Sequence, residues 1–289
     1  MSREDAPHVD MTRDGARVRI AGTGYALELD VEAALRRAPV ARLEDAAGAA
    51  WSELSLLASA HTRTGADETV RVLGVDVDAA DGGVAVRVRA RSSAWERRDL
   101  VLRCLPDRVE ATLELDGRGD LTDVTVLGGR GALPNAATGE FRSRIGFGGV
   151  LVPAATEPVQ LVRPATTPGA LVVVGDADAG RLNAVFSPPP LAFGLSRAEP
   201  SDATGVPGGD WLGMWLRAPV EELTLTGWHY APLDGGFLVR ATYEGHTPVD
   251  GSWVSPVLVL RPAAGGWAVL DDYRAALAAH GLAPAARPD

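Results

Sequence analysis

The chain contains no lysine, so each of its 28 basic side chains is an arginine. The 38 acidic residues outnumber them and give a formal net charge of −10 at pH 7. Nucleic acids and anionic membranes are bound through concentrated positive patches, which release counterions. The charge balance therefore argues against nucleic acid and membrane as partners and favours a neutral one.

Cysteine is nearly absent too, and the single Cys104 excludes an internal disulfide and a thiolate metal cluster. It lies in the apolar run DLVLRC, which is typical of a buried small hydrophobic residue. The five histidines lack the paired spacing of a zinc site, and no GxxxxGK[ST] motif for phosphates occurs. We therefore expect neither a metal nor a cofactor.

Long hydrophobic runs are also missing. None approaches the length of a membrane span, and the first fifteen residues lack the apolar core of a secretory signal. Hydrophobic residues nevertheless make up 46% of the chain, which is ample for a buried core. These features predict a soluble, cytoplasmic, globular protein.

Short segments of alternating apolar and polar residues are abundant, and glycine, aspartate and proline separate them. Residues 68–91 predict a hairpin, and residues 99–129 predict further strands with turns at LPDR (105–108) and DGRGD (116–120). Strands at this spacing, without helices between them, predict an all-β fold, an antiparallel sandwich with large sheets. Further strands are expected near 25–30, 51–57, 170–175, 181–186, 211–217, 222–229, 236–243 and 253–260.

Two segments depart from the strand pattern. Residues 129–149 are rich in glycine and irregular, which predicts a long surface loop. Residues 269–284 predict a short C-terminal helix, with Asp271 and Asp272 in its first turn. Its apolar residues at helical spacing are Leu270, Tyr273 and Leu277. Because so short a helix is marginal alone, we expect it to dock on another part of the protein.

Aromatic residues are concentrated late in the chain, where five of the seven tryptophans follow residue 210. Ring faces suit sugars, and histidine and carboxylate groups add directional hydrogen bonds. Trp211 and Trp215 share one face of a strand, and such a face serves a core as readily as a ligand. TPVDG (247–251) is expected to form a turn. The candidate carbohydrate-binding residues are Trp211, Trp215, His229, Tyr243, Glu244, His246 and Trp253.

Segments 95–129, 181–195, 211–260 and 271–284 follow an order that resembles the amino-terminal β-sandwich domain of family-36-type α-galactosidases. The resemblance implies a galactose-mutarotase-like β-supersandwich, here residues 1–268, and a helical linker, here residues 269–289. In that family the linker leads to a (β/α)₈ barrel, in which two aspartates carry the catalysis. No residue of this chain matches either aspartate, so no catalytic residue is assigned.

The function that this resemblance implies is that of a non-catalytic domain that supports, and helps to complete, the sugar site of a barrel. A galactoside-type carbohydrate and a catalytic barrel, in cis or in trans, are the expected partners. A rival interpretation is a stand-alone enzyme like an aldose 1-epimerase, which needs a histidine acid and a glutamate base. His229, His246 and Glu244 are the residues available for it. A free carbohydrate-binding module is a third interpretation, and the sequence leaves all three open.

Overall fold

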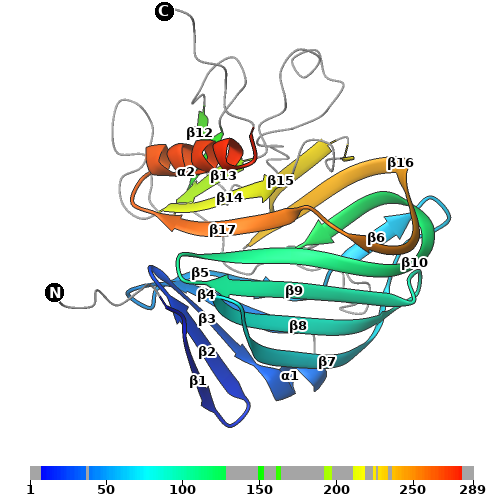
Figure 1. The fold of residues 1–289 in the computed structure, drawn as a ribbon, viewed down its shortest axis with the longest axis horizontal. Coiled ribbons are helices and arrows are strands. Elements are labelled where there is room, and N and C mark those ends of the chain that lie inside the picture. Colours follow the sequence, from blue (N-terminus) through cyan, green and yellow to red (C-terminus); the bar gives the residue numbers. More distant parts are fainter. Residues whose placement is uncertain are drawn as a thin grey trace, which may run out of the picture.

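The computed structural model describes residues 8–36, 39–127, 149–152, 161–163, 192–196, 211–218, 224–225, 227–233 and 236–281. Two antiparallel sheets and two helices make up this part of the chain (Figure 1). The predicted all-β class with a short C-terminal helix is confirmed. The strands expected at 170–175 and 181–186, and nearly all of the loop expected at 129–149, lie outside the described residues.

A five-stranded sheet is built from neighbouring strands in chain order. Only its third and fifth strands were expected from the sequence. A short helix, α1 (Val31–Arg36), follows the third strand, and Asp30 caps it by accepting a hydrogen bond from the Ala33 N–H at 2.8 Å. The strands are β1 (Asp10–Asp14), β2 (Arg17–Gly22), β3 (Tyr25–Asp30), β4 (Val40–Asp45) and β5 (Ala50–Ser55).

The larger sheet has twelve strands, and its main path runs β12-β11-β13-β14-β17-β10-β9-β8-β7. The hairpin expected at 68–91 is confirmed as β7 and β8, and the turn expected at 105–108 joins β9 to β10. The strands are β6 (Ser59–Thr62), β7 (Thr69–Ala80), β8 (Gly83–Ser92), β9 (Arg97–Leu105), β10 (Arg108–Val126), β11 (Gly149–Val152), β12 (Leu161–Arg163), β13 (Ala192–Ser196), β14 (Trp211–Arg217), β15 (Gly227–Leu233), β16 (Gly236–Val254) and β17 (Val257–Ala263).

Two predicted turns are wrong, because their residues lie in the middle of the long strands β10 and β16. The segments 116–120 and 247–251 pair with one another, and Gly117 lies opposite Gly251. Both glycines have positive φ, +140° and +99°, which side-chain-bearing residues rarely adopt. The turn residues thus bend a continuous ladder instead of ending it, and both ribbons curve at the right-hand side of Figure 1.

The boundaries of the later strands also shift. The strand expected at 222–229 is observed as β15, which begins at Gly227, and the strand expected at 253–260 begins at Val257. Trp253 belongs to the end of β16, where it pairs with Leu115 of β10. β15 pairs with β16, and β17 pairs with β14 and β10; the local residue pattern does not record where these ladders begin.

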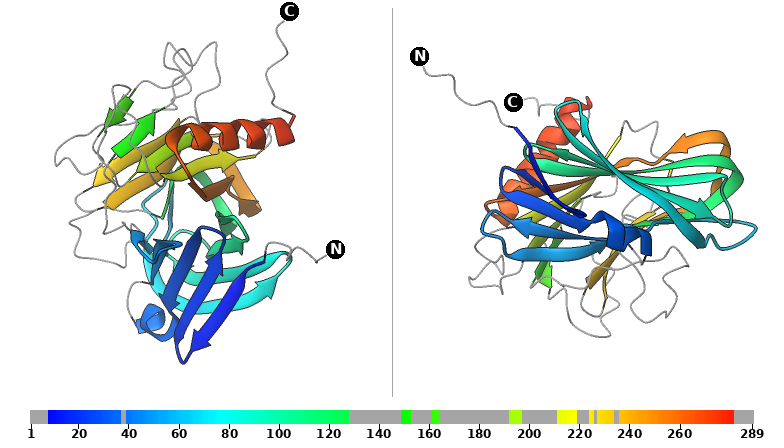
Figure 2. Two further views of the ribbon diagram at one scale, coloured as in Figure 1. Left: turned by 90° about the vertical axis from the view of Figure 1, so that its left-hand side faces the viewer. Right: turned by 90° about the horizontal axis from the view of Figure 1, so that it is seen from below.

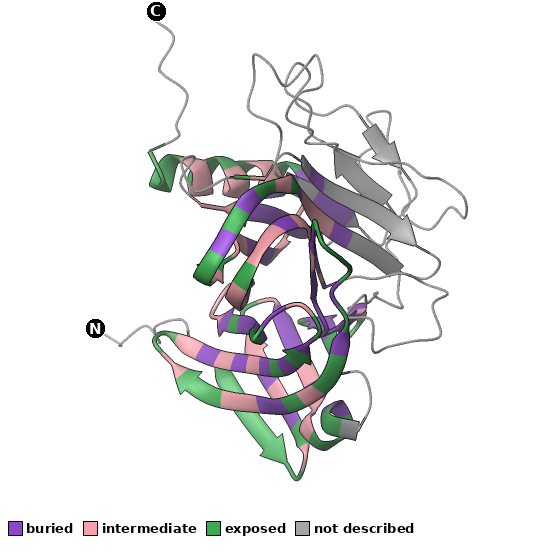
Figure 3. Cartoon of the chain, turned by 90° about the vertical axis from the view of Figure 1, so that its right-hand side faces the viewer, coloured by how far each residue is buried: buried purple, intermediate pink, exposed green. Residues whose placement is uncertain are grey.

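The hydrophobic core lies between the two sheets, and the small sheet lies across β7 to β10 (Figures 2 and 3). Alternation places Val84, Val86 and Val88 of β8 in this core. Cys104 is fully buried there, and burial raises the pKa of its thiol to about 12, as suits a packing residue. Tyr25 connects the two sheets, because its hydroxyl donates a hydrogen bond to the Leu105 carbonyl at 2.6 Å.

A buried ion pair ties β9 to the segment before β7. Arg98 and Asp67 are 1% and 0% exposed, and the guanidinium donates to the carboxylate. Asp67 also accepts from the Ser92 hydroxyl and from the Ala60 N–H, while Arg98 donates to Thr69. Desolvation lowers the pKa of Arg98, and Asp67 opposes this shift. The pair therefore holds four chain segments in register inside the core.

The C-terminal helix α2 (Gly266–Ala279) begins three residues earlier than expected and packs on β13, β14 and β17. Its docking on the sandwich is confirmed by Val269, which is buried against Trp211. Asp271 and Asp272 lie in the second turn, so the expected role at the first turn is wrong. Neither described helix is long and apolar enough to cross a membrane.

We predict that Gly213→Ala destabilises the protein by about 1–3 kcal/mol, because β14 and α2 are in close contact there. The added Cβ would lie 2.8 Å from Cζ3 of Trp215 and 3.1 Å from Cγ1 of Val269. Urea denaturation measures the change. Gly65→Ala is the matched control, because its Cβ meets nothing within 4 Å. Equal urea midpoints for the two variants would contradict the close contact.

We predict that Arg98→Met lowers the free energy of unfolding by about 3–5 kcal/mol, because it leaves the Asp67 carboxylate charged and buried without its partner. The control is Arg118→Met, which removes the same charge from a pair with Asp250 whose side chains are 82% and 75% exposed. That change should cost less than about 1 kcal/mol. Chemical denaturation of both variants decides between a structural and a negligible role for the buried pair.

Candidate functional site

Trp211 and Trp215, two of the predicted sugar-binding residues, lie on the face of β14 that α2 covers. Trp211 is 0% exposed and packs on Val269, and Trp215 is 3% exposed and packs among Val259 and Tyr273. Both side chains pack among residues of the helix and of the sheet. The indole N–H of Trp215 has no hydrogen-bond partner among the described residues.

Tyr243 and Trp253 lie together at the other side of the large sheet. Their rings meet edge to face, with centroids 5.8 Å apart and planes at 84°. Tyr243 is buried, which raises the pKa of its hydroxyl, and that hydroxyl has no partner in the described part of the chain. The adjoining cavity measures about 20 Å³, enough for about one water molecule and too small for a sugar ring.

Glu244 and His246 are exposed at an irregularity in β16. Leu121 of β10 pairs with Thr247 and Asp123 pairs with Thr242, so four residues of β16 oppose one of β10. Glu244 and Gly245 take φ of +52° and +76° there. Such a bulge re-aims side chains away from the sheet.

The predicted site residues therefore fall into two places: under α2, and around the bulge of β16. His229 lies in β15 opposite Arg240, and its side chain is outside the described part of the chain. Binding of a sugar by these seven residues remains a prediction.

Charged residues instead gather on the outer face of the large sheet, the same face on which α2 lies. Register shows this: Glu110 pairs with Val259, and Val259 pairs with Trp215 beneath the helix. Side chains alternate along a strand, so Glu114 of β10 and its partner Asp99 of β9 share this face. Beyond the helix, the outer face of β7 to β10 is thus strongly polar.

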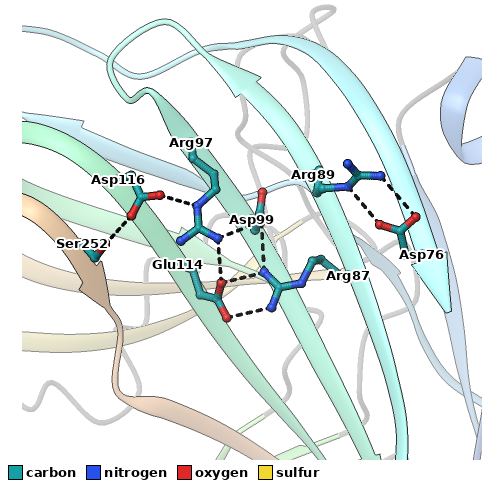
Figure 4. Close-up of polar contacts among 8 residues, drawn as sticks. All are labelled: Asp76, Arg87, Arg89, Arg97, Asp99, Glu114, Asp116 and Ser252. Carbon is teal, nitrogen blue, oxygen red and sulfur yellow. Dashed lines mark hydrogen bonds and ion pairs between the residues drawn. The ribbon is translucent and has the colours of Figure 1, made fainter. Parts of the chain in front are cut away.

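The ion-pair lattice on this face joins β7, β8, β9, β10 and β16 (Figure 4). Arg87 binds Glu114 through both terminal nitrogens, at 2.6 and 3.1 Å, and reaches Asp99 at 3.0 Å. Arg97 binds Asp116 at 2.5 Å, and Asp116 accepts a hydrogen bond from Ser252 at 2.6 Å. The lattice comprises Asp76, Arg87, Arg89, Arg97, Asp99, Glu114, Asp116 and Ser252.

Contacts within the lattice shift the pKa of one carboxylate, Asp116, and of Arg87. Hydrogen bonds from Arg97 and Ser252 lower the pKa of Asp116, and the bond to Glu114 raises the pKa of Arg87. An ionised carboxylate accepts hydrogen bonds and has no proton to give. Asp116 is therefore better suited to a polar contact than to general acid catalysis. In the described ranges, no group of three or more potential ligands could hold a metal ion.

A pocket lies where α2 meets the large sheet, and we call it the helix pocket. Its volume is about 240 Å³. Strands β10, β14 and β17 supply one wall, and α2 from Asp272 onward supplies the other. The lining residues are Arg108, Trp215, Arg217, Val259, Arg261, Asp272, Ala275, Ala276, Ala279 and His280.

Alternating charges run along the sheet wall of the helix pocket. Glu110 accepts from Arg217 at 2.8 Å and from Arg108 at 2.7 Å. Asp107 then bridges Arg108, at 2.8 Å, to Arg261, at 3.3 Å.

At the helix end of the pocket, Arg261 reaches Asp272 of α2 at 3.1 Å. Burial raises the pKa of Asp272, and Arg261 opposes this shift. The three arginines of the sheet wall are therefore each held by at least one carboxylate.

The arginines of the helix pocket were not among the predicted site residues. They are far apart in the chain, on β10, β14 and β17, and no local motif joins them. One signal was present: Arg217 follows Trp215 by two residues, and Arg261 follows Val259 by two. Alternation along a strand therefore placed both on the face that packs against α2.

No family model matches the chain, and no curated protein matches it. Among solved structures, it is similar to the galactosidase domain of an α-galactosidase–sucrose kinase, AgaSK, at 11% identity and a TM-score of 0.47. An α-galactosidase from Lactobacillus brevis aligns at 10% identity and a TM-score of 0.41. These alignments cover 92% and 97% of this chain, which spans 43% and 42% of the length of the two galactosidase chains.

A putative aldose 1-epimerase from Escherichia coli K12 aligns at 10% identity and a TM-score of 0.38, over 88% of this chain and 100% of that chain. The α-galactosidases are the family that the sequence resembles, and the epimerase corresponds to the rival interpretation. At these identities and TM-scores the alignments carry no residue roles.

We predict that Trp211→Ala costs about 3–5 kcal/mol of stability, because the ring is fully buried between β14 and α2. His246→Ala should change stability by less than about 0.5 kcal/mol, because the side chain is exposed. Thermal and urea denaturation of both variants measure the difference. A Trp211→Ala protein as stable as the wild type would contradict the role of this ring in packing.

Proposed function

We propose that the chain is an accessory β-sandwich domain of a glycoside hydrolase of the α-galactosidase type. In this proposal residues 1–268 form the sandwich, and residues 269–289 form a helical linker toward a (β/α)₈ barrel. The barrel, in cis or in trans, carries the catalysis. The sandwich supports the barrel and helps to complete its site for a galactoside.

The observation that carries the proposal is that carboxylates on the outer face of the large sheet are paired with arginines. A glycosidase needs one carboxyl that holds a proton and a second that faces it across the scissile bond. Asp99, Glu114 and Asp116 are instead each in contact with a guanidinium, as is the buried Glu110. Such a surface supports a neighbouring domain better than it performs acid–base chemistry.

The position of α2 supports the same proposal. It lies across β13, β14 and β17 and buries Val269 against the sheet. A segment that follows this helix therefore leaves the sandwich from a fixed place on its outer face. That arrangement suits a linker that must present a second domain at a defined orientation, because the helix cannot swing freely.

We predict that purified residues 1–289 do not hydrolyse 4-nitrophenyl α-galactoside, because the catalytic pair belongs to the barrel. Release of nitrophenol is followed by absorbance. The positive control is the product of any reading frame that continues beyond residue 289, which should be active. Turnover by residues 1–289 that a single substitution abolishes would contradict the accessory role.

The epimerase interpretation is tested separately by polarimetry with α-galactose and α-glucose. Under the accessory role, the chain leaves the rate of mutarotation unchanged. Acceleration that is lost in His246→Ala, Glu244→Gln or His229→Ala would favour the epimerase and contradict the accessory role. Tyr25→Phe, a change within the core, serves as the control for general loss of structure.

A further inference from the structure

The helix pocket brings three arginines of an acidic protein together in one lining. The chain as a whole carries a formal net charge of −10. The pocket is lined by three arginines and one carboxylate, that of Asp272, with His280 at its edge. The lining side chains by themselves are therefore positive, and Glu110 and Asp107 behind them balance the remaining charge of the cluster.

The carboxylates that hold the pocket arginines are set apart from its lining. Glu110, whose side chain is 4% exposed, binds Arg108 and Arg217, and Asp107 binds Arg108 and Arg261. Neither carboxylate lines the pocket. A guanidinium has five N–H donors in a fixed fork, so one that is held by a carboxylate still has donors for a second acceptor.

Partial burial strengthens the charge interactions that these arginines can make with a ligand. The side chains of Arg108, Arg217 and Arg261 are 30%, 28% and 33% exposed, so much of each is removed from water. Charge interactions gain strength when water is partly excluded. Their ion-pair partners also restrict their rotamers before a ligand arrives, which reduces the entropy lost on binding.

The remaining walls are apolar and close together. Trp215 and Val259 line the sheet side, and Ala275, Ala276 and Ala279 line the helix side. Small side chains on α2 leave room beside the sheet. At about 240 Å³ the pocket is slightly smaller than the usual sites for drug-sized ligands, of about 300–1,000 Å³. It therefore suits a ligand of about the size of one sugar ring.

We infer that the helix pocket binds a small molecule through an oxyanion, a carboxylate or a phosphate, which Arg108, Arg217 and Arg261 receive. Paired guanidinium donors match the oxygens of either group. Asp272 opposes the anion and limits its affinity. The inference stands independently of the accessory role, because it depends only on residues of this chain.

Isothermal titration calorimetry in low-salt, phosphate-free buffer tests the inference with galacturonate, galactose 6-phosphate and inorganic phosphate. Galactose is the uncharged reference. We expect at least one of the three anions to bind and galactose to bind at least about tenfold more weakly. Binding of inorganic phosphate as tight as that of galactose 6-phosphate would assign recognition to the oxyanion alone. Tighter binding of galactose 6-phosphate would add contacts with the ring.

Two substitutions should change the affinity in opposite directions. Arg261→Gln should weaken binding about tenfold, because it removes one guanidinium. Asp272→Asn should strengthen binding about threefold or more, because it removes the opposing charge and releases Arg261. A merely structural role for Asp272 would not tighten binding.

The matched control is Arg89→Gln, which makes the same change of charge in the ion-pair lattice, where Arg89 pairs with Asp76. It should change the affinity by less than about twofold, and thermal denaturation establishes that each variant is folded. Absence of binding by all three anions would overturn the inference. So would binding of galactose as tight as that of galacturonate, or binding that Arg261→Gln leaves unchanged.

Discussion

One bent strand, β10, joins the two parts of the large sheet, and the rest of the molecule is arranged around it. It pairs with β9 along one edge, with β17 and β16 along the other, and with β6 near its end. Gly117 and the opposing Gly251 allow it to bend without leaving the ladder. Because the hydrogen bonds continue through this bend, β6 and the earlier part of β16 belong to the same sheet as the strands that support α2 and the ion-pair lattice.

Burial divides the charged residues into two kinds. Arg98 and Asp67 lie inside the core, where each is neutralised by the other and by neighbouring hydrogen bonds. The loss of one partner there leaves a charge that water cannot reach. Arg87 and Arg97 lie on the outer face, where 34% and 43% of their side chains remain exposed and water still reaches the pairs. The buried pair thus fixes the register, while the lattice shapes the surface.

The aromatic residues illustrate how packing competes with binding. Trp211, Gly213 and Trp215 lie on the same face of β14, which α2 covers. Gly213, between the two tryptophans, lets α2 approach closely. The same contact opens a pocket farther along the helix, where the small Ala275, Ala276 and Ala279 face the arginines of the sheet. The large rings fill one part of the interface, and polar groups line the other. A binding role at this interface therefore belongs to the arginines more than to the tryptophan faces.

The sequence by itself determined the all-β class, the hairpin of β7 and β8, the turn between β9 and β10, and a terminal helix that docks. Each depends on neighbouring residues, through alternation, turn chemistry or helical spacing. Only the tertiary structure decided that segments 116–120 and 247–251 bend rather than turn. It alone brought Arg108, Arg217 and Arg261 to one pocket. The physical reason is that strand pairing joins residues more than a hundred positions apart, and no local pattern records which strand will lie alongside.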